Sequence, residues 1–145
     1  MNAPIRKFDD LSESLNLLSG EIVDCAFKVH QQLGPGFLEN IYEEALCIEL
    51  KKKNIHFEKQ KPFKIKYDNQ FLSTEFRFDL VVEEKILLEL KAVKEFHPLH
   101  MAQIYAYLSA TQYPLGLLIN FNVPLIKDGI KRIKLRNSEP PREIK

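Results

Sequence analysis

Ionisable residues interrupt the most apolar stretch of the chain, residues 76–93, which reads FRFDLVVEEKILLELKAV. Two carboxylic acids, Asp79 and Glu89, lie within it, and Lys91 follows two residues later. Two neighbouring carboxylates can hold a divalent cation together with water. A lysine beside them can position an attacking water or stabilise charge that grows on a phosphoryl oxygen. These are the groups needed for in-line attack of water on a phosphodiester.

A β-hairpin would bring these groups to one place. A turn centred on Glu84 pairs Asp79 with Glu89 and Arg77 with Lys91, and side chains alternate between the two faces of a strand. Those four residues therefore share one face. The other face is a continuous core made of Phe76, Phe78, Leu80, Val82, Ile86, Leu88, Leu90 and Ala92. Opposed Cβ atoms lie about 4.5–5.5 Å apart, so the two carboxylates would raise each other's pKa unless a cation lay between them.

The spacing also fits a simpler arrangement. Opposed charges on a sheet face commonly form cross-strand salt bridges, and these need no metal. A shift of the turn by one residue would send the two acids to different faces. Spacing alone leaves a metal site and a salt-bridge network both open.

Helical periodicity dominates the first third of the chain. Apolar residues predict a helix over residues 18–33, with Ser19 as a candidate N-cap, and a second over residues 38–53. Gly34 can adopt the left-handed conformation that ends the first helix. Residues 1–16 are polar and mixed, which predicts a flexible N-terminal arm.

The pattern then changes to the two-residue period of strands. A half-exposed strand is expected before an Asp68-Asn69 turn, and the hairpin strands follow over residues 71–82 and 86–93. Pro98 can begin a helix that ends near Thr111. Further strands are expected over residues 115–121 and 130–135. The order predicts one mixed α/β domain.

Composition supports a globular chain. Of its 145 residues, 45% are hydrophobic and 28% are charged, which excludes a disordered protein. No apolar run approaches the length of a membrane span or of a signal peptide core, so we expect no membrane association. Cys25 and Cys47 fall on apolar helix faces, which predicts core thiols and a cytoplasmic protein.

The formal net charge of +1 argues against binding nucleic acid by electrostatics alone. A basic segment nevertheless occupies residues 127–136. It could form a strip that contacts phosphates, or its lysines could protect an exposed edge strand from pairing. The cations of the segment are Lys127, Lys131, Arg132, Lys134 and Arg136.

The hairpin residues resemble a known signature. Asp79 followed by Glu89-Leu90-Lys91 is similar to the D…(D/E)xK motif of the PD-(D/E)XK nuclease superfamily, and Phe78 replaces the proline of that motif. GFLENIY, residues 36–42, resembles the motif that names the GxxExxY family, a branch of this superfamily. The resemblance continues through VHQQLGPGFLENIYEEAL, LLELKAV, MAQIYAYL, GLLINF and GIKRI, and covers residues 17–136.

The resemblance implies a restriction-endonuclease-like αβββαβ core, with a central mixed sheet flanked by helices. The domain would occupy residues 17–136, and residues 137–145 would form a C-terminal tail. No four-cysteine cluster is present, so the iron–sulfur exonuclease branch is not expected.

Site roles follow from the same resemblance. Mg²⁺ or Mn²⁺ would be held by Asp79, Glu89, Glu39 and the backbone carbonyl of Leu90, with Lys91 as the catalytic lysine. Further residues would support the site or contact substrate: Tyr42, Gln103 and Tyr107. His30 and His100 are either neighbours of the site or packed side chains.

The implied function is metal-dependent hydrolysis of phosphodiester bonds in DNA, with RNA as an open alternative. The near-zero net charge keeps a second interpretation open, in which a nuclease-like fold binds nucleic acid or protein without catalysis. The chain would act alone, as a homodimer or with a protein partner.

Overall fold

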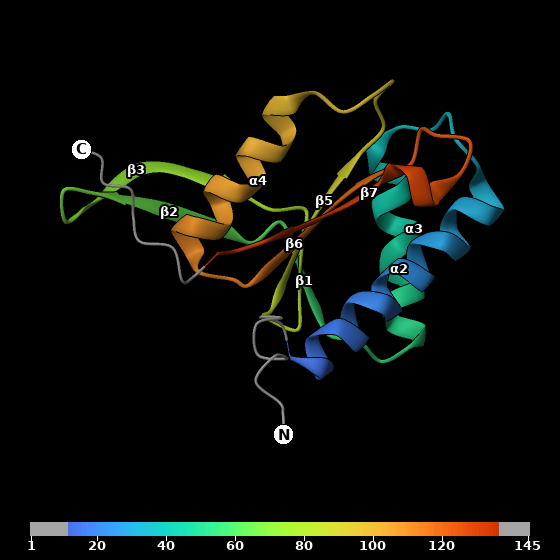
Figure 1. Ribbon diagram of the computed structural model, residues 1–145, viewed down its shortest axis with the longest axis horizontal. Coiled ribbons are helices and arrows are strands. Elements are labelled where there is room, and N and C mark those ends of the chain that lie inside the picture. Colours follow the sequence, from blue (N-terminus) through green and yellow to red (C-terminus); the bar gives the residue numbers. More distant parts are fainter. Residues whose placement is uncertain (1–11, 137–145) are drawn as a thin grey trace.

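The computed structural model describes residues 12–136, in which helices lie on both sides of a central sheet (Figure 1). The elements in chain order are α2 (Glu13–Leu33), α3 (Glu39–Lys52), β1 (Phe57–Lys59), β2 (Pro62–Tyr67), β3 (Gln70–Arg77), β4 (Leu80–Val82), β5 (Ile86–Lys91), α4 (Pro98–Thr111), β6 (Leu115–Asn120), a 3₁₀ turn η1 (Ile126–Gly129) and β7 (Ile130–Lys134). Residues 1–11 and 137–145, which include most of the expected arm and the expected tail, lie outside the described residues.

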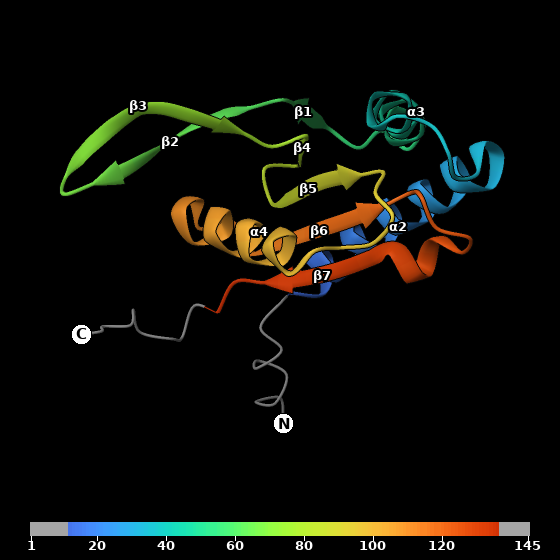
Figure 2. The ribbon, with the colours of Figure 1, turned by 90° about the horizontal axis from the view of Figure 1, so that it is seen from above.

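The central sheet has five strands in the order β1-β4-β5-β6-β7. Strands β5 and β6 are parallel and are joined through α4, while the other neighbours are antiparallel. Strands β2 and β3 form a separate two-stranded sheet that extends away from the central one (Figure 2). The mixed sheet flanked by helices confirms the predicted restriction-endonuclease-like fold class.

Two hydrophobic clusters hold the layers together. Helices α2 and α3 cover one face of the sheet, where they bury residues including Ile22, Val29, Leu46, Leu50, Leu80, Val82, Leu88, Leu90 and Ile119. Helix α4 covers the other face over a smaller, aromatic cluster formed by Phe78, Val81, Leu87 and Leu108, with Phe63, Phe76 and Tyr107 packed against it. Gly116 lets α4 approach closely, because a Cβ there would lie 2.9 Å from a methyl group of Ile104.

The first helix begins earlier than expected. It starts at Glu13, and the Ser12 hydroxyl caps it by accepting a hydrogen bond from the Leu15 amide at 3.1 Å. Ser19, the expected N-cap, is buried in the middle of this helix. Residues 13–16, which were expected to belong to the N-terminal arm, are therefore part of α2.

The expected turn residues end or connect the elements. Gly34 ends α2, and its amide donates to the carbonyl of His30, but its φ of 69° and ψ of −176° lie outside the left-handed helical region that was expected. Asp68 and Asn69 have φ values of 55° and 62° in the turn between β2 and β3. Both residue types tolerate the left-handed region better than most.

The expected strand over residues 71–82 is divided. The backbone leaves strand geometry at Phe78 and bends at Asp79, so that β3 pairs with β2 while β4 joins the central sheet. Phe76 and Phe78 consequently pack under α4, away from Leu80 and Val82, with which they were expected to share a core face. The aromatic cluster under α4 stabilises this exchange of faces.

The remaining sequence predictions concern cysteines and membranes. Cys25 and Cys47 are free and buried, as expected, and burial raises the pKa of both thiols. Within residues 12–136, no helix has the length and apolar character required to cross a bilayer.

Candidate active site

An open cleft of about 130 Å³ lies between the carboxyl end of β5 and helix α4. Its walls combine ionisable and polar side chains with two apolar ones. They are Arg77, Glu89, Lys91, His100, Gln103, Ile104, Tyr107 and Leu118. The cleft thus gathers residues from the hairpin, from α4 and from β6.

The predicted hairpin register is observed between β4 and β5, but the predicted pairing of Arg77 with Lys91 is wrong, because Arg77 pairs with Pro62 of β2. Leu80 pairs with Leu88 and Val82 with Ile86, so continuing this register by one position brings Asp79 opposite Glu89. Asp79 is fixed at the bend by two hydrogen bonds. Its carboxylate Oδ2 accepts from the Leu90 amide at 2.7 Å, and its backbone carbonyl accepts from the Gln60 amide at 3.0 Å.

The surroundings of Glu89 change its protonation. Burial, followed by the charge and hydrogen bond of Asp79, raises the pKa of Glu89 to about 8, against an ordinary value of 4.5. The nearby charge of Lys91 opposes this rise, and the charge of Glu39 adds to it. Glu89 therefore holds a proton at neutral pH, next to the carboxylate of Asp79.

The backbone amide and carbonyl of Leu90 lie on the side of β5 that faces Asp79. In a strand, the amide and carbonyl of one residue point to the same side. Because the Leu90 amide donates to Asp79, the Leu90 carbonyl is directed toward that side as well. Strand β4 begins only at Leu80, so this carbonyl lies beyond the last paired residue of β4.

Lys91 lies half-buried at the end of β5, and the backbone around it is held firmly. Its carbonyl accepts from the Phe121 amide at 3.0 Å. The buried side chain of Asn120 accepts from the Val93 amide at 3.0 Å and donates to the Val93 carbonyl at 2.9 Å. These bonds fix the segment from which the lysine projects into the cleft.

Glu39 is the first residue of α3 and is exposed. Its charge adds to the rise in the pKa of Glu89 and opposes the fall in the pKa of His100. Across residues 12–136, however, no three His, Cys, Asp or Glu side chains converge closely enough to hold a metal ion. The structure thus brings Asp79 and Glu89 together, while Glu39 acts on Glu89 through its charge.

Sequence reasoning missed a second acid on α3. Glu43 lies one turn after Glu39, and burial together with the charge of Asp79 raises its pKa. The Gln60 side-chain amide donates to the Glu43 carboxylate at 3.5 Å. The spacing of four residues on one helix was the signal that could have found it.

Tyr42 has a structural position. Its hydroxyl donates to the Gly34 carbonyl at 2.6 Å and accepts from the Phe37 amide at 3.1 Å. Its ring stacks on Phe121 with centroids 4.5 Å apart and is fully buried. Tyr42 therefore holds the loop that leads into Glu39, and it lies outside the cleft lining.

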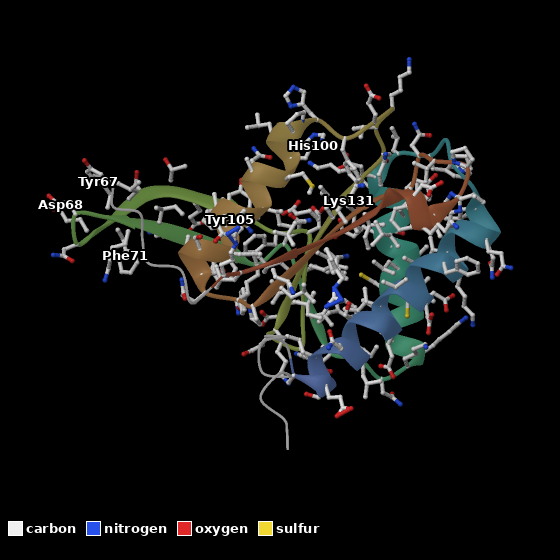
Figure 3. All side chains as sticks on the ribbon, viewed as in Figure 1. Tyr67, Asp68, Phe71, His100, Tyr105 and Lys131 are labelled. Atoms are coloured by element: carbon white, nitrogen blue, oxygen red, sulfur yellow. The ribbon has the colours of Figure 1, made fainter. Side chains whose placement is uncertain are left out.

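Helix α4 contributes three polar groups to the cleft. Gln103 and Tyr107 lie one helical turn apart, and Tyr107 stacks on Phe76 at 4.4 Å. Burial, and then the charge of Glu89, raises the pKa of Tyr107. His100, labelled in Figure 3, caps the helix through its Nδ1, which accepts from the His97 amide at 3.0 Å. Desolvation and the charge of Lys91 lower the pKa of His100.

Arg77 lines the cleft, and sequence reasoning left it without a role. Its guanidinium donates to the Gln60 carbonyl at 3.1 Å and lies 3.6 Å from the Glu75 carboxylate. The hairpin pattern had placed Arg77 opposite Lys91. What the pattern could not show was that both residues would border one cleft with α4.

The remaining candidates lie elsewhere. His30 is buried in α2 and its Nε2 contacts the Val123 carbonyl at 2.8 Å. In β7, alternation directs Lys131 and Arg132 to opposite faces, and Arg132 donates to Asn16 at 2.9 Å. The basic segment is therefore divided between two faces. The cleft lining includes none of its cations, namely Lys127, Lys131, Arg132, Lys134 and Arg136.

Comparison with known proteins supports an assignment to a family. Residues 16–133 match the PD-(D/E)XK nuclease superfamily. None of the curated proteins compared with the chain matches it. Among solved structures, the crystal structure of SSO0001 is similar, with 22% sequence identity and a TM-score of 0.45 over 67% of this chain. The similar region spans 49% of the SSO0001 chain, about half its length. Because the superfamily match covers most of the residues, the chain belongs to the PD-(D/E)XK nuclease superfamily.

Proposed function

We propose that the chain is a divalent-metal-dependent nuclease that hydrolyses phosphodiester bonds in DNA. The observation that carries the proposal is the pair formed by Asp79 and Glu89 beside Lys91, at the edge of an open cleft. PD-(D/E)XK nucleases generally use divalent metals, which supports a hydrolytic role for this cleft.

The donor set fits a cation. Two facing carboxyl groups share a proton at neutral pH, and a divalent cation can replace that proton by neutralising both acids. Asp79, Glu89 and the Leu90 carbonyl would hold Mg²⁺ or Mn²⁺, and Glu39 would contribute through water. When bound, such an ion supplies a polarised water and neutralises charge on the phosphate.

The protein's own residues would perform the other steps. The Lys91 ammonium orients the attacking water and stabilises the negative charge that develops on a non-bridging phosphate oxygen. Arg77 and Gln103 line the cleft and can donate hydrogen bonds to phosphate oxygens. Tyr107 also lines the cleft and can donate through its hydroxyl.

We further propose that the chain belongs to the GxxExxY branch. The structure suggests why its motif residues occur together. Gly36 has φ 112°, which an L side chain rarely adopts, and Tyr42 ties the glycine loop to the core. This loop sets the start of α3 and with it the position of Glu39. The free, buried cysteines are consistent with a cytoplasmic location.

One observation favours a second function. The net charge of +1 is low for a protein that must hold nucleic acid unaided. A non-enzymatic module that binds nucleic acid or a protein partner, with Asp79 and Glu89 joined by a proton, is therefore the alternative. RNA in place of DNA would leave the cleft chemistry unchanged.

A cleavage assay distinguishes the two functions. Purified chain is incubated with labelled DNA and Mg²⁺ or Mn²⁺, and the Asp79→Asn variant is compared with wild type. We expect cleavage by wild type and loss of about 10²–10³-fold in the variant. The exposed Asp128→Asn variant serves as a matched control and should cleave normally. Equal cleavage by wild type and Asp79→Asn would contradict the proposal.

A further inference from the structure

The β2–β3 arm, residues 62–77, carries exposed aromatic side chains at the end remote from the central sheet. Its base is anchored where Phe63 and Phe76 pack against the cluster under α4. At the far end, Tyr67 is 71% and Phe71 is 66% exposed. Figure 3 shows these two side chains on opposite sides of the arm. Leu72 beside them is 42% exposed, so apolar surface gathers at this end of the arm, and gathered apolar surface is typical of interaction sites.

Strand pairing defines which residues accompany Phe71. Lys66 pairs with Phe71 and Lys64 pairs with Glu75, with an irregular step of the ladder between the two pairs. Paired residues share a face, and residues an even number of positions apart in one strand do so as well, which assigns Lys64, Lys66, Phe71, Glu75 and Arg77 to one side of the arm. The Lys66 ammonium lies 5.2 Å from the centre of the Phe71 ring. Glu75 is the one acid of this face, and it lies 3.6 Å from Arg77. We call this surface, formed by Lys64, Lys66, Phe71 and Arg77, the outer arm face.

The outer arm face is continuous with the cleft. Arg77 lines the cleft beside Glu89 and Lys91. Phe71 lies six positions before Arg77 in the same strand, which corresponds to about 20 Å of extended chain. Cations and an exposed ring therefore extend from the cleft toward the tip of the arm.

This combination suits one class of ligand. Lysine ammonium groups attract phosphates, and exposed aromatic rings stack with bases that are free of a duplex. We propose that the outer arm face binds a single-stranded segment of the nucleic acid whose phosphodiester enters the cleft. The proposal rests on the proposed nuclease function and specifies the substrate class: a strand with unpaired bases next to the bond that is cleaved.

Binding without cleavage tests the arm first. Fluorescence anisotropy with a labelled oligo-deoxythymidine in the presence of chelator measures affinity alone. Phe71→Ala should bind about tenfold more weakly, whereas Tyr67→Ala, an equally exposed ring on the opposite face, should bind as wild type. Combined Lys64→Gln and Lys66→Gln should reduce the slope of log affinity against log salt by about 1.4. Melting curves of these exposed-site variants should match wild type.

Hydrolysis of a small diester separates this proposal from the proposed function. Bis(p-nitrophenyl) phosphate can reach the cleft without touching the arm. With Mn²⁺, Phe71→Ala should hydrolyse it as wild type does, and Asp79→Asn should not. If wild type binds the oligonucleotide through Phe71 but leaves the diester intact, the nuclease function fails while the arm site stands.

Other results would overturn the arm site itself. These are unchanged oligonucleotide binding in Phe71→Ala, equal losses in Phe71→Ala and Tyr67→Ala, or tighter binding of a blunt duplex than of the single strand. Sedimentation gives one more test. If Phe71→Ala converts a dimer of wild type into monomers, the outer arm face is an interface between copies of the chain, and the proposal is wrong.

Discussion

The Asp79 carboxylate accepts a hydrogen bond from the Leu90 amide at 2.7 Å, at the point where the β4–β5 ladder ends. A side chain thus replaces the backbone partner that a longer β4 would have supplied. The bond fixes Asp79 beside Glu89 and leaves the cleft edge of β5 open. We expect catalysis by the chain to depend on this replacement of a backbone hydrogen bond by a side-chain one.

Substitution of Glu89 should make stability less dependent on pH. Folding raises the pKa of Glu89 to about 8, so between its ordinary value and about 8 the native state binds more protons than the unfolded state. The free energy of unfolding therefore falls as the pH rises through this window. In chelator, Glu89→Gln should be more stable than wild type by on the order of 2 kcal/mol above pH 8.

Urea denaturation at about pH 5 and about pH 9 measures this difference. The difference in the free energy of unfolding between Glu89→Gln and wild type should be small at the lower pH and large at the higher one. Glu84→Gln, in the exposed turn before β5, provides the control and should behave as wild type at both. A difference between Glu89→Gln and wild type that does not change with pH would contradict the shared proton.

Removal of the Lys91 charge should abolish turnover without harming the fold. Lys91→Met keeps most of the side chain but cannot stabilise negative charge on phosphate. We expect cleavage to fall by about 10²–10³-fold, with a melting temperature close to that of wild type. Lys85→Met changes an exposed lysine at the other end of the hairpin and should leave cleavage intact. Similar rates for the two variants would exclude a catalytic role for Lys91.

Glu39→Gln should weaken metal binding and also change the pH profile. Because the charge of Glu39 raises the pKa of Glu89, its removal should lower that pKa and move the acid limb of the cleavage profile to lower pH. Loss of an outer ligand typically costs about 10–100-fold in metal affinity. Glu44→Gln on the same helix is the comparison. Identical profiles in both variants would show that Glu39 acts only on the helix.

Tyr42→Phe should destabilise the glycine loop. The variant leaves the Gly34 carbonyl and the Phe37 amide without their buried partner, at a cost of about 1–3 kcal/mol. Tyr67→Phe, at an exposed position, should cost less than about 0.5 kcal/mol. Chemical denaturation compares the two, and equal effects would mean that the Tyr42 hydroxyl does not stabilise the loop.

The hairpin register was predictable because local rules determine it. A charged turn at residues 83–85 between apolar strands and a two-residue alternation suffice to place Asp79 opposite Glu89. Pro98 likewise marked the start of α4. These features depend on near neighbours in the sequence.

The break at Asp79 could not be predicted in the same way. Phe76 and Phe78 continue the alternation of Leu80 and Val82, and nothing local distinguishes them. Their exchange of faces depends on Phe63 and Tyr107, which lie far away in the sequence. The cleft escaped prediction for the same reason, since α4 brings Gln103 and Tyr107 to Arg77 only through this packing.

Calorimetric titration with Mn²⁺ near neutral pH tests the central claim most directly. If Asp79 and Glu89 hold the cation together, wild type should bind Mn²⁺ and release about one proton, measurable by comparing buffers of different ionisation enthalpy. Binding should disappear in both Asp79→Asn and Glu89→Gln and persist in Asp128→Asn. Absence of binding heat in wild type, or undiminished binding in the first two variants, would contradict the account.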